Sequence, residues 1–223
     1  MKKLVAVVPV RKGSQRVKHK NFKPFGGKNL LIHKIEILKK LDFIDQIIIN
    51  TDSNKAIKIA KELNVQYFKR DDYFASSKCL NSDFWGNVAK NTNSEFIMFT
   101  NCTSPLIKLN TYNEIISIFR KKILKNKFDS INTVTEIREF LFKNSKPINF
   151  KTNKTPNSQD LPDIVKLNFA INILKTKQML SKKSLIGNKP YLYKLNEIEG
   201  LDINSEHEFS FAEYLFKKKS FKP

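Results

Sequence analysis

The chain is short of cysteine and of long apolar runs, and each shortage excludes a class of protein. Its 223 residues include two cysteines, Cys79 and Cys102, which are far apart and lack metal-ligand spacing, so neither a disulfide scaffold nor a cysteine-held metal is expected. We expect both thiols to be reduced and the protein to be cytoplasmic. No apolar run is long enough to cross a membrane, and the run at residues 4–8 is ended by Pro9 and Arg11 without a small-residue cleavage site. We therefore expect a buried strand there, and no membrane partner.

Acidic residues are also scarce, since 41 lysines and arginines face 21 aspartates and glutamates and give a formal net charge of +20. Such a charge suits a nucleic-acid surface. The cations, however, are almost all lysines spread along the chain, and no helix-turn-helix, zinc-finger or aromatic-basic RNA signature is present. We interpret the charge as a solvated lysine-rich surface and expect no nucleic-acid partner. A nucleic-acid-binding module remains an alternative that rests on charge alone.

Apolar segments alternate with amphipathic ones along most of the chain, which indicates an α/β protein. The apolar runs predict strands at residues 4–8, 46–50, 65–68, 96–99, 130–134, 166–174 and 191–195. Helical spacing predicts helices at residues 30–41, 55–63, 83–90, 111–124 and 206–217. Strands that are apolar on both faces favour a mostly parallel sheet between two layers of helices. Such sheets bind ligands beyond the carboxyl ends of their strands, which here are the loops after Val8, Asn50 and Thr100.

Residues 142–163 break this pattern, because Asn, Lys, Pro, Thr and Ser dominate there. We interpret them as a protruding hairpin arm, at about residues 140–165 of a single domain that spans residues 1–223. A lone exposed hairpin is marginal in water, and Phe140, Phe142 and Phe150 could supply it with an apolar contact.

The loop after the first expected strand, at residues 9–21, combines positive charge with small residues. Arg11, Arg16 and several lysines can neutralise phosphates, while Gly13 and Ser14 allow backbone and hydroxyl donors to approach an oxygen closely. This composition indicates a triphosphate-binding loop, and the alternative is a basic surface loop without a ligand. The segment has neither the spacing of a Walker A loop nor a G-x-G-x-x-G motif.

This loop resembles the signature P-A-R-x-G-S-x-x-x-x-x-K-N of the acylneuraminate cytidylyltransferases, the CMP-sialic acid synthetases. Every fixed position matches, except that Val10 replaces the alanine. The resemblance implies a three-layer Rossmann-like nucleotidyltransferase fold with a mostly parallel sheet and a small protruding hairpin arm. It implies that Arg11 and Lys20 contact the CTP phosphates and are catalytic. The residues that it places at the nucleotide are Val10, Arg11, Gly13, Ser14, Lys20 and Asn21.

The resemblance continues into the segments after the second and third strands. Arg70 stands where the family has an arginine that reads cytosine, and the alternative for it is an ion pair with Asp71 or Asp72. Ser82 lies in a region that approaches the base in the family, and a helix cap is the alternative there. Asp52 is either a ligand contact or the N-cap of the next helix.

The expected sugar side carries both matches and departures. Asn101, Gln159 and Asn168 lie in segments that resemble Q-P-T-S-P-L, Q-D-L-P and N-G-A-I-Y of the family, and together with Lys166 we assign them to the acceptor sugar. Asn101 replaces a glutamine and Phe169 replaces a glycine. The resemblance therefore leaves the identity of the sugar open.

Residues 201–204, Leu-Asp-Ile-Asn, resemble the I-D-I-D of the family, whose carboxylates bind Mg²⁺. Residues two apart on a strand point to the same face, so Asp202 and Asn204 are the expected metal ligands, and Asp202 is also expected to be catalytic. Asn204 brings no charge, which predicts weaker metal binding. It could equally cap the final helix together with Ser205.

The resemblance implies a CTP-dependent cytidylyltransferase that moves CMP to the anomeric hydroxyl of an acidic 2-keto sugar of the sialic, legionaminic or pseudaminic acid type and releases pyrophosphate. It also implies Mg²⁺ as the cofactor and a homodimer whose arms reach across to the partner. Two alternatives remain. One is a catalytically weakened paralogue that binds nucleotide, and the other is a cytidylyltransferase that acts on a different anionic precursor of surface polysaccharide.

Overall fold

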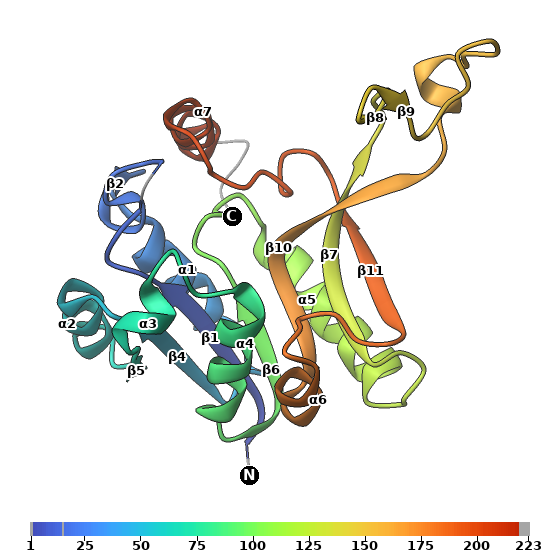
Figure 1. Ribbon diagram of the computed structural model, residues 1–223. Coiled ribbons are helices and arrows are strands. Elements are labelled where there is room, and N and C mark those ends of the chain that lie inside the picture. The colour runs from blue at the N-terminus through green and yellow to red at the C-terminus, as the bar shows by residue number, and fades with distance from the viewer. Residues whose placement is uncertain (1, 15, 219–223) are drawn as a thin grey trace.

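A seven-stranded sheet forms the centre of the protein in the computed structural model, which describes residues 2–14 and 16–218 (Figure 1). The strand order is β11-β7-β10-β6-β1-β4-β5. These strands are β1 (Lys2–Val10), β4 (Gln46–Thr51), β5 (Gln66–Lys69), β6 (Ser94–Thr100), β7 (Ser130–Ile137), β10 (Ile164–Lys175) and β11 (Pro190–Leu195). β1 pairs in parallel with β4 and β6, β4 with β5, and β7 with β11, whereas β10 runs antiparallel between β6 and β7. The prediction of a mostly parallel α/β sheet is confirmed.

Helices cover both faces of this sheet. Side chains alternate between the two faces along a strand, so one strand contributes to the core on each face. Leu4 and Ala6 of β1 pack in one core with α1, α2 and α5, while Val5 and Val7 pack in a second core with α4 and α6. The helices are α1 (Leu30–Leu38), α2 (Asn54–Glu62), α3 (Asp72–Ala75), α4 (Asn81–Lys90), α5 (Leu109–Ile118), α6 (Thr176–Lys182) and α7 (Glu206–Lys217), and α5 runs on into a π-helical turn, Phe119–Ile123. Within the described part of the chain, no helix has the length and apolar character needed to span a membrane.

Polar side chains set the starts of three helices. Asn29, Ser53 and Ser205 cap α1, α2 and α7, and each accepts a hydrogen bond from the backbone N–H three residues later. The sequence did not predict several short elements, among them α3, α6 and the ribbon of β2 (Pro24–Phe25) and β3 (Lys28–Asn29). All of them are too short to show a clear hydrophobic period.

The predicted arm projects from the body of the protein on the far ends of β7 and β10 (Figure 1). It contains the ribbon of β8 (Phe142–Lys143) and β9 (Lys146–Pro147), followed by the 3₁₀ turn η3 (Ser158–Asp160). Phe150 packs edge-on against Phe140 and Phe142, with ring centroids 5.0 and 5.3 Å away. Phe142 is nevertheless 59% exposed, so this cluster presents an apolar surface.

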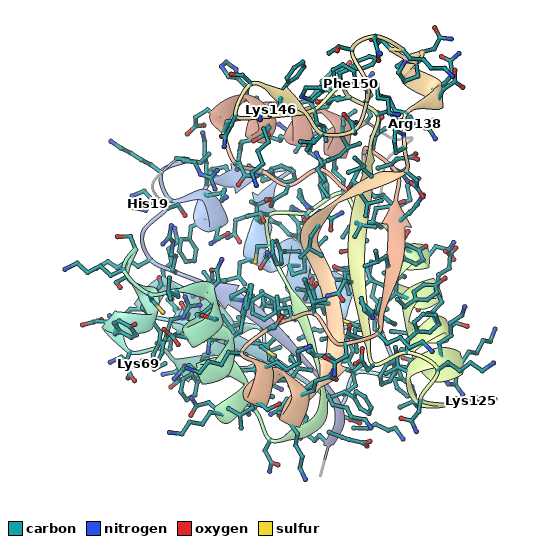
Figure 2. The ribbon with its side chains drawn as sticks, turned by 45° about the vertical axis from the view of Figure 1, so that its right-hand side comes forward. His19, Lys69, Lys125, Arg138, Lys146 and Phe150 are labelled. Atoms are coloured by element: carbon teal, nitrogen blue, oxygen red, sulfur yellow. The ribbon has the colours of Figure 1, made fainter. Side chains whose placement is uncertain are left out.

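Exposed lysines lie on different parts of the surface that the structure describes. Figure 2 shows Lys69 and Lys125 pointing outward from opposite sides of the body and Lys146 on the arm. All three side chains are exposed. This arrangement fits the interpretation of a solvated lysine-rich surface.

Candidate active site

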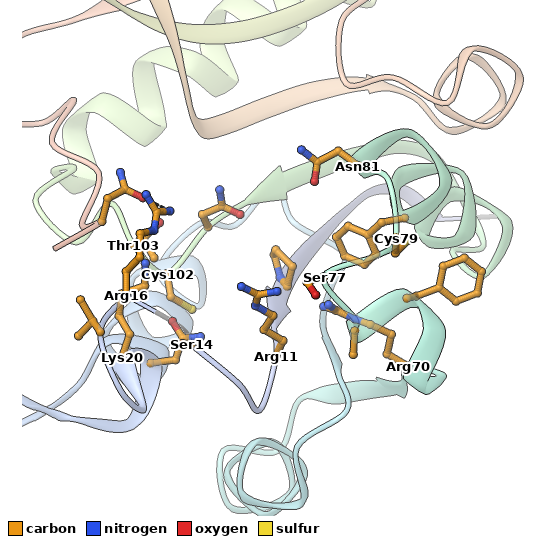
Figure 3. Close-up of a pocket in the computed structure, with 18 of the residues that line it drawn as sticks. Arg11, Ser14, Arg16, Lys20, Arg70, Ser77, Cys79, Asn81, Cys102 and Thr103 are labelled. Atoms are coloured by element: carbon orange, nitrogen blue, oxygen red, sulfur yellow. Dashed lines mark hydrogen bonds between the residues drawn. The ribbon is translucent and has the colours of Figure 1, made fainter.

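A cavity of about 560 Å³ lies beyond the carboxyl ends of β1 and β6, where the strand pattern predicts a ligand site. Its walls come from the loop after β1, the start of the segment after β5, the N-terminal part of α4, the loop after β6 and the segment before α7. Among the described residues that line it, Arg11, Arg16, Lys20 and Arg70 are cationic and Asp202 is acidic. Figure 3 shows Arg16 and Lys20 at one end, Arg70 at the other end, and Arg11 between them. The cavity is therefore suited to a long anion.

The loop after β1 is anchored to β4 from outside the cavity. Asp52 Oδ1 accepts a hydrogen bond of 2.7 Å from the backbone N–H of Lys12. Ser53 caps α2, so the capping role foreseen for Asp52 is wrong, and a ligand contact of Asp52 stays a prediction. Val10 is fully buried in the core below the loop, and Gly13 is exposed, with no described atom within 4 Å of the position that a Cβ would take. Neither of these two residues lines the cavity.

Lys20 joins this loop to the segment before α7. Its Nζ donates a hydrogen bond of 2.5 Å to the backbone carbonyl oxygen of Ile203. Burial lowers the pKa of Lys20 below its ordinary value, Arg16 and Arg11 lower it further, and the Asp202 carboxylate acts in the opposite direction. An ammonium that is buried among other cations is stabilised when an anion occupies the cavity.

Asn21 follows Lys20 and lies in the cavity wall. It is 7% exposed, and its Oδ1 has no hydrogen-bond partner among the described residues. A buried polar atom without a partner is costly, so this carboxamide is suited to meet a ligand or water. A contact between Asn21 and the nucleotide stays a prediction.

Asp202, Asn204 and Arg16 form a chain of hydrogen bonds at the same end of the cavity. Asn204 Nδ2 donates to Asp202 Oδ2 at 2.8 Å, and Asn204 Oδ1 accepts from Arg16 Nη2 at 2.7 Å. Asn204 does not cap α7, because Ser205 takes that position. Asn204 therefore links the acidic side chain to a cationic one.

The residues present fit Mg²⁺ at one position. Asp202 Oδ1 is buried and has no hydrogen-bond partner among the described residues, so one carboxylate oxygen is available in the cavity. Asn204 Oδ1 accepts a hydrogen bond from Arg16, and its role as a metal ligand stays a prediction. In the described chain no three or more His, Cys, Asp or Glu side chains gather where they could hold a metal. Mg²⁺ often binds through one or two carboxylates together with substrate phosphates, so Asp202 fits a metal that binds together with a nucleotide.

Arg70 lines the opposite end of the cavity and is held within hydrogen-bond distance of Asn50. Arg70 Nε donates to Asn50 Oδ1 at 2.7 Å, and Nη2 donates to the Asn50 carbonyl oxygen at 2.8 Å. The guanidinium lies over the ring of Phe84, 4.2 Å from its centroid. Burial lowers the pKa of Arg70 to about 10, which leaves the group cationic at neutral pH. The foreseen ion pair with Asp71 or Asp72 is not among the contacts that the structure shows for Arg70.

The loop after β6 contributes Asn101, Cys102 and Thr103 to the cavity wall, and Cys102 and Thr103 lie beside Arg16 (Figure 3). A contact between Asn101 and an acceptor sugar stays a prediction. The loop is supported from below by Lys34, a buried residue whose Nζ donates to Tyr112 Oη at 2.5 Å and to the Ser104 carbonyl oxygen at 3.4 Å.

Four other predicted site residues do not lie in the cavity wall. Ser82 stands in the first turn of α4, but Asn81 faces the cavity and Leu80 occupies the cap position. Gln159 is exposed on the arm, and Lys166 is exposed on β10. Asn168 is buried at a bulge of β10, where its Oδ1 accepts a hydrogen bond from Thr133 and its Nδ2 donates one to Thr135.

Several cavity residues were not predicted, among them Asn81 and Phe84. Arg16 also lines the cavity, and the density of arginine in the loop after β1 is the signal that marked it as a phosphate-neutralising cation. Asn81 and Phe84 carry no such signal, because the position of α4 over the sheet brings them to the cavity.

Comparison with known proteins shows the family to which the chain is related. Residues 5–206 match the family model described as cytidylyltransferase. Over 99% of this chain and 97% of the relative, the sequence is 24% identical to post-translational flagellin modification protein B of Campylobacter coli. It is 23% identical to CMP-N,N'-diacetyllegionaminic acid synthase of Campylobacter jejuni, over all of this chain and 99% of the relative. A solved structure of CMP:2-keto-3-deoxy-manno-octonic acid synthetase complexed with CTP superposes with a TM-score of 0.72 at 12% identity, over 96% of this chain and 98% of that chain, which shows the shared fold.

Proposed function

Because this chain belongs to the cytidylyltransferase family, we propose that it transfers CMP from CTP to the anomeric hydroxyl of an acidic 2-keto sugar and releases pyrophosphate. The single observation that carries this proposal is the cavity itself, which brings Arg16 and Lys20 to one end and Arg70 to the other, with Arg11 between them. Binding of a triphosphate requires several cations close together. Recognition of the nucleotide base requires hydrogen-bond donors of fixed direction at some distance from those cations.

The phosphate end would act mainly through charge. Arg11, Arg16 and Lys20 neutralise the α-phosphate and the departing pyrophosphate. Arg16 and Lys20 are held before the ligand arrives by their bonds to Asn204 and Ile203. The anomeric oxygen forms a bond to the α-phosphorus, the bond from that phosphorus to the bridging oxygen of pyrophosphate breaks, and the hydroxyl proton is released. Such a transfer depends on in-line positioning and on charge neutralisation more than on covalent help from the protein.

Mg²⁺ belongs to this proposal through Asp202. The carboxylate oxygen without a partner would hold the ion together with the nucleotide phosphates, and the bound ion would neutralise phosphate charge. Asp202 also keeps the Asn204 carboxamide turned toward Arg16, which orients that guanidinium in the cavity.

The acceptor is proposed to be an acidic sugar of the sialic, legionaminic or pseudaminic type. The relative from Campylobacter jejuni, which is named for CMP-N,N'-diacetyllegionaminic acid synthesis and aligns along the whole chain, supports a nine-carbon sugar. A sugar carboxylate is attracted by the cationic cavity, and Asn101 in the wall could hydrogen-bond to it.

A homodimer and a cytoplasmic location complete the proposal. The arm exposes Phe142 and Ile148, which a partner could cover. Gln159 lies on the same arm, so it could contact an acceptor in the partner's cavity. The free thiols of Cys79 and Cys102 fit a reducing compartment.

A second candidate, a nucleotide-binding paralogue with weakened catalysis, is favoured by one observation. Among the described residues that line the cavity, Asp202 is the single acidic one. The Asn204 side chain, which stands in place of a second carboxylate, is hydrogen-bonded to Arg16. Pyrophosphate release from CTP in the presence of Mg²⁺ and a panel of acidic 2-keto sugars separates the two. Turnover with one sugar supports the transferase, and tight CTP binding without turnover on any sugar supports the paralogue. Turnover with another anionic sugar would instead identify a different surface-polysaccharide precursor.

A further inference from the structure

The hydrogen bonds that orient the Arg70 side chain run to one neighbour, Asn50. Asn50 lies near the end of β4, and Arg70 directly follows β5, which pairs in parallel with β4. The backbone N–H of Arg70 donates to the Thr51 carbonyl oxygen at 2.7 Å, so the two strand ends are held together at this point. Asn50 is 2% exposed and Arg70 is 5% exposed, so both side chains are fixed in the interior.

The two bonds between these residues occupy one edge of the guanidinium. Nε donates to Asn50 Oδ1 at 2.7 Å, and Nη2 donates to the Asn50 carbonyl oxygen at 2.8 Å. Because Nε and Nη2 share one edge of the planar group, the opposite edge keeps the Nη1 donors and the second Nη2 donor. The contacts shown among the described residues include no acceptor for Nη1, and Arg70 lines the cavity.

Phe84 fixes the plane of the same group. Its ring lies 4.2 Å from the guanidinium carbon, and it packs edge-on against Phe99 at 6.2 Å between centroids. A guanidinium that is held at one edge and stacked on one face has little freedom left to rotate. Its remaining donors therefore keep a constant direction.

We propose that Asn50 is a positioning residue that sets the preference for cytosine over uracil. This inference rests on the proposed function, since it takes CTP as the nucleotide. Two parallel N–H donors match the adjacent O2 and N3 acceptors of cytosine. Uracil carries a hydrogen on N3, so one donor would face another donor, and such a mismatch in a buried site is strongly disfavoured.

Calorimetric titration of CTP and UTP, each with MgCl₂, tests this inference without an acceptor sugar. The wild-type protein is expected to bind CTP more tightly than UTP. Asn50→Ala removes the acceptor of Nε but keeps the backbone carbonyl, and the ratio of the two affinities is expected to fall by about tenfold, mainly through weaker CTP binding. Asn50→Asp keeps an oxygen in the same place and is expected to retain the ratio.

Two further variants protect the test against a trivial loss of stability. Asn132→Ala removes a fully buried asparagine of β7 whose bonds run to Asn172 and Leu185, away from the cavity, and it is expected to keep the wild-type ratio. Asn50→Ser, with a side chain too short to reach Nε, replaces Asn50→Ala if the alanine variant does not fold.

Different results would contradict different claims. A folded Asn50→Ala or Asn50→Ser protein with the wild-type CTP:UTP ratio would overturn the role of Asn50, as would a loss of the ratio in Asn132→Ala as large as that in Asn50→Ala. A wild-type protein that binds neither nucleotide, or prefers UTP, would instead contradict the proposed function.

Discussion

Lys20 and Ile203 are 183 residues apart in the chain, and a hydrogen bond of 2.5 Å from Lys20 Nζ to the Ile203 carbonyl oxygen joins them. Ile203 stands between Asp202 and Asn204, so this bond fixes the loop after β1 against the segment that carries the cavity carboxylate. The phosphate end of the cavity is thus assembled from both ends of the chain.

Loss of the Lys20 ammonium is expected to impair catalysis more than folding. Lys20→Ala removes a preorganised charge next to the phosphates, and turnover should fall by at least about a hundredfold. Lys18→Ala is the matched control, because Lys18 is an exposed lysine of the same loop that does not line the cavity. Pyrophosphate release measures both variants, and a near-wild-type rate in Lys20→Ala would refute the assigned role.

The pH dependence should carry the signature of Lys20. Burial lowers its pKa below the ordinary 10.5, so in the free enzyme the ammonium is lost at a lower pH than in an exposed lysine. We expect kcat/KM for CTP to fall on the alkaline side through this lowered pKa, and Lys20→Arg should move that fall to higher pH.

Between the lowered and the ordinary pKa the unfolded chain binds more protons than the folded one, so the Lys20 contribution to stability rises with pH in that window. An alkaline limb that is unchanged in Lys20→Arg would show that another group titrates.

Asn204→Asp is expected to strengthen metal binding. The new carboxylate can still accept from Arg16, but it no longer donates to Asp202, so two acidic groups face each other until a cation binds. The Mg²⁺ concentration that gives half-maximal turnover should fall several-fold. The melting temperature should also fall without Mg²⁺ and recover when Mg²⁺ is added.

Asp202→Asn serves as the control for that experiment, because it removes the carboxylate and should abolish the response of the melting temperature to Mg²⁺. A melting temperature of Asn204→Asp that does not respond to Mg²⁺ would contradict the metal site.

The sheet could be predicted from the sequence because its central strands are buried on both faces. β1 and β4 are continuous apolar runs, and an amphipathic helix follows each of them in the chain. α6 could not be predicted in this way, since its seven residues contribute Met179 to the core but show no repeating apolar period.

The grouping of the loop residues after β1 was also foreseen, because these residues lie close together in sequence, whereas their binding of a triphosphate stays a prediction. Arg11, Ser14, Lys20 and Asn21 all line the cavity. The partner of Arg70 was not foreseen, because Asn50 comes beside it only through the pairing of β4 with β5. Asn168 likewise turns into the sheet because a bulge of β10 places its side chain between Thr133 and Thr135.

The arm is expected to hold a homodimer together. Phe142→Ser removes an apolar side chain that is 59% exposed, and it should convert the dimer to a monomer. Tyr214→Ser is the control, because Tyr214 is 56% exposed but lies on α7. Light scattering after size-exclusion chromatography measures the mass, and a monomeric wild-type protein or a dimeric Phe142→Ser protein would contradict the proposal.

A crystal structure of the protein with CTP bound tests the central claim most directly. The account predicts the triphosphate among Arg11, Ser14 and Lys20, with the cytosine ring at Arg70 and Phe84. A nucleotide bound elsewhere on the protein, or one with its base among the loop cations and its phosphates at Arg70, would contradict it.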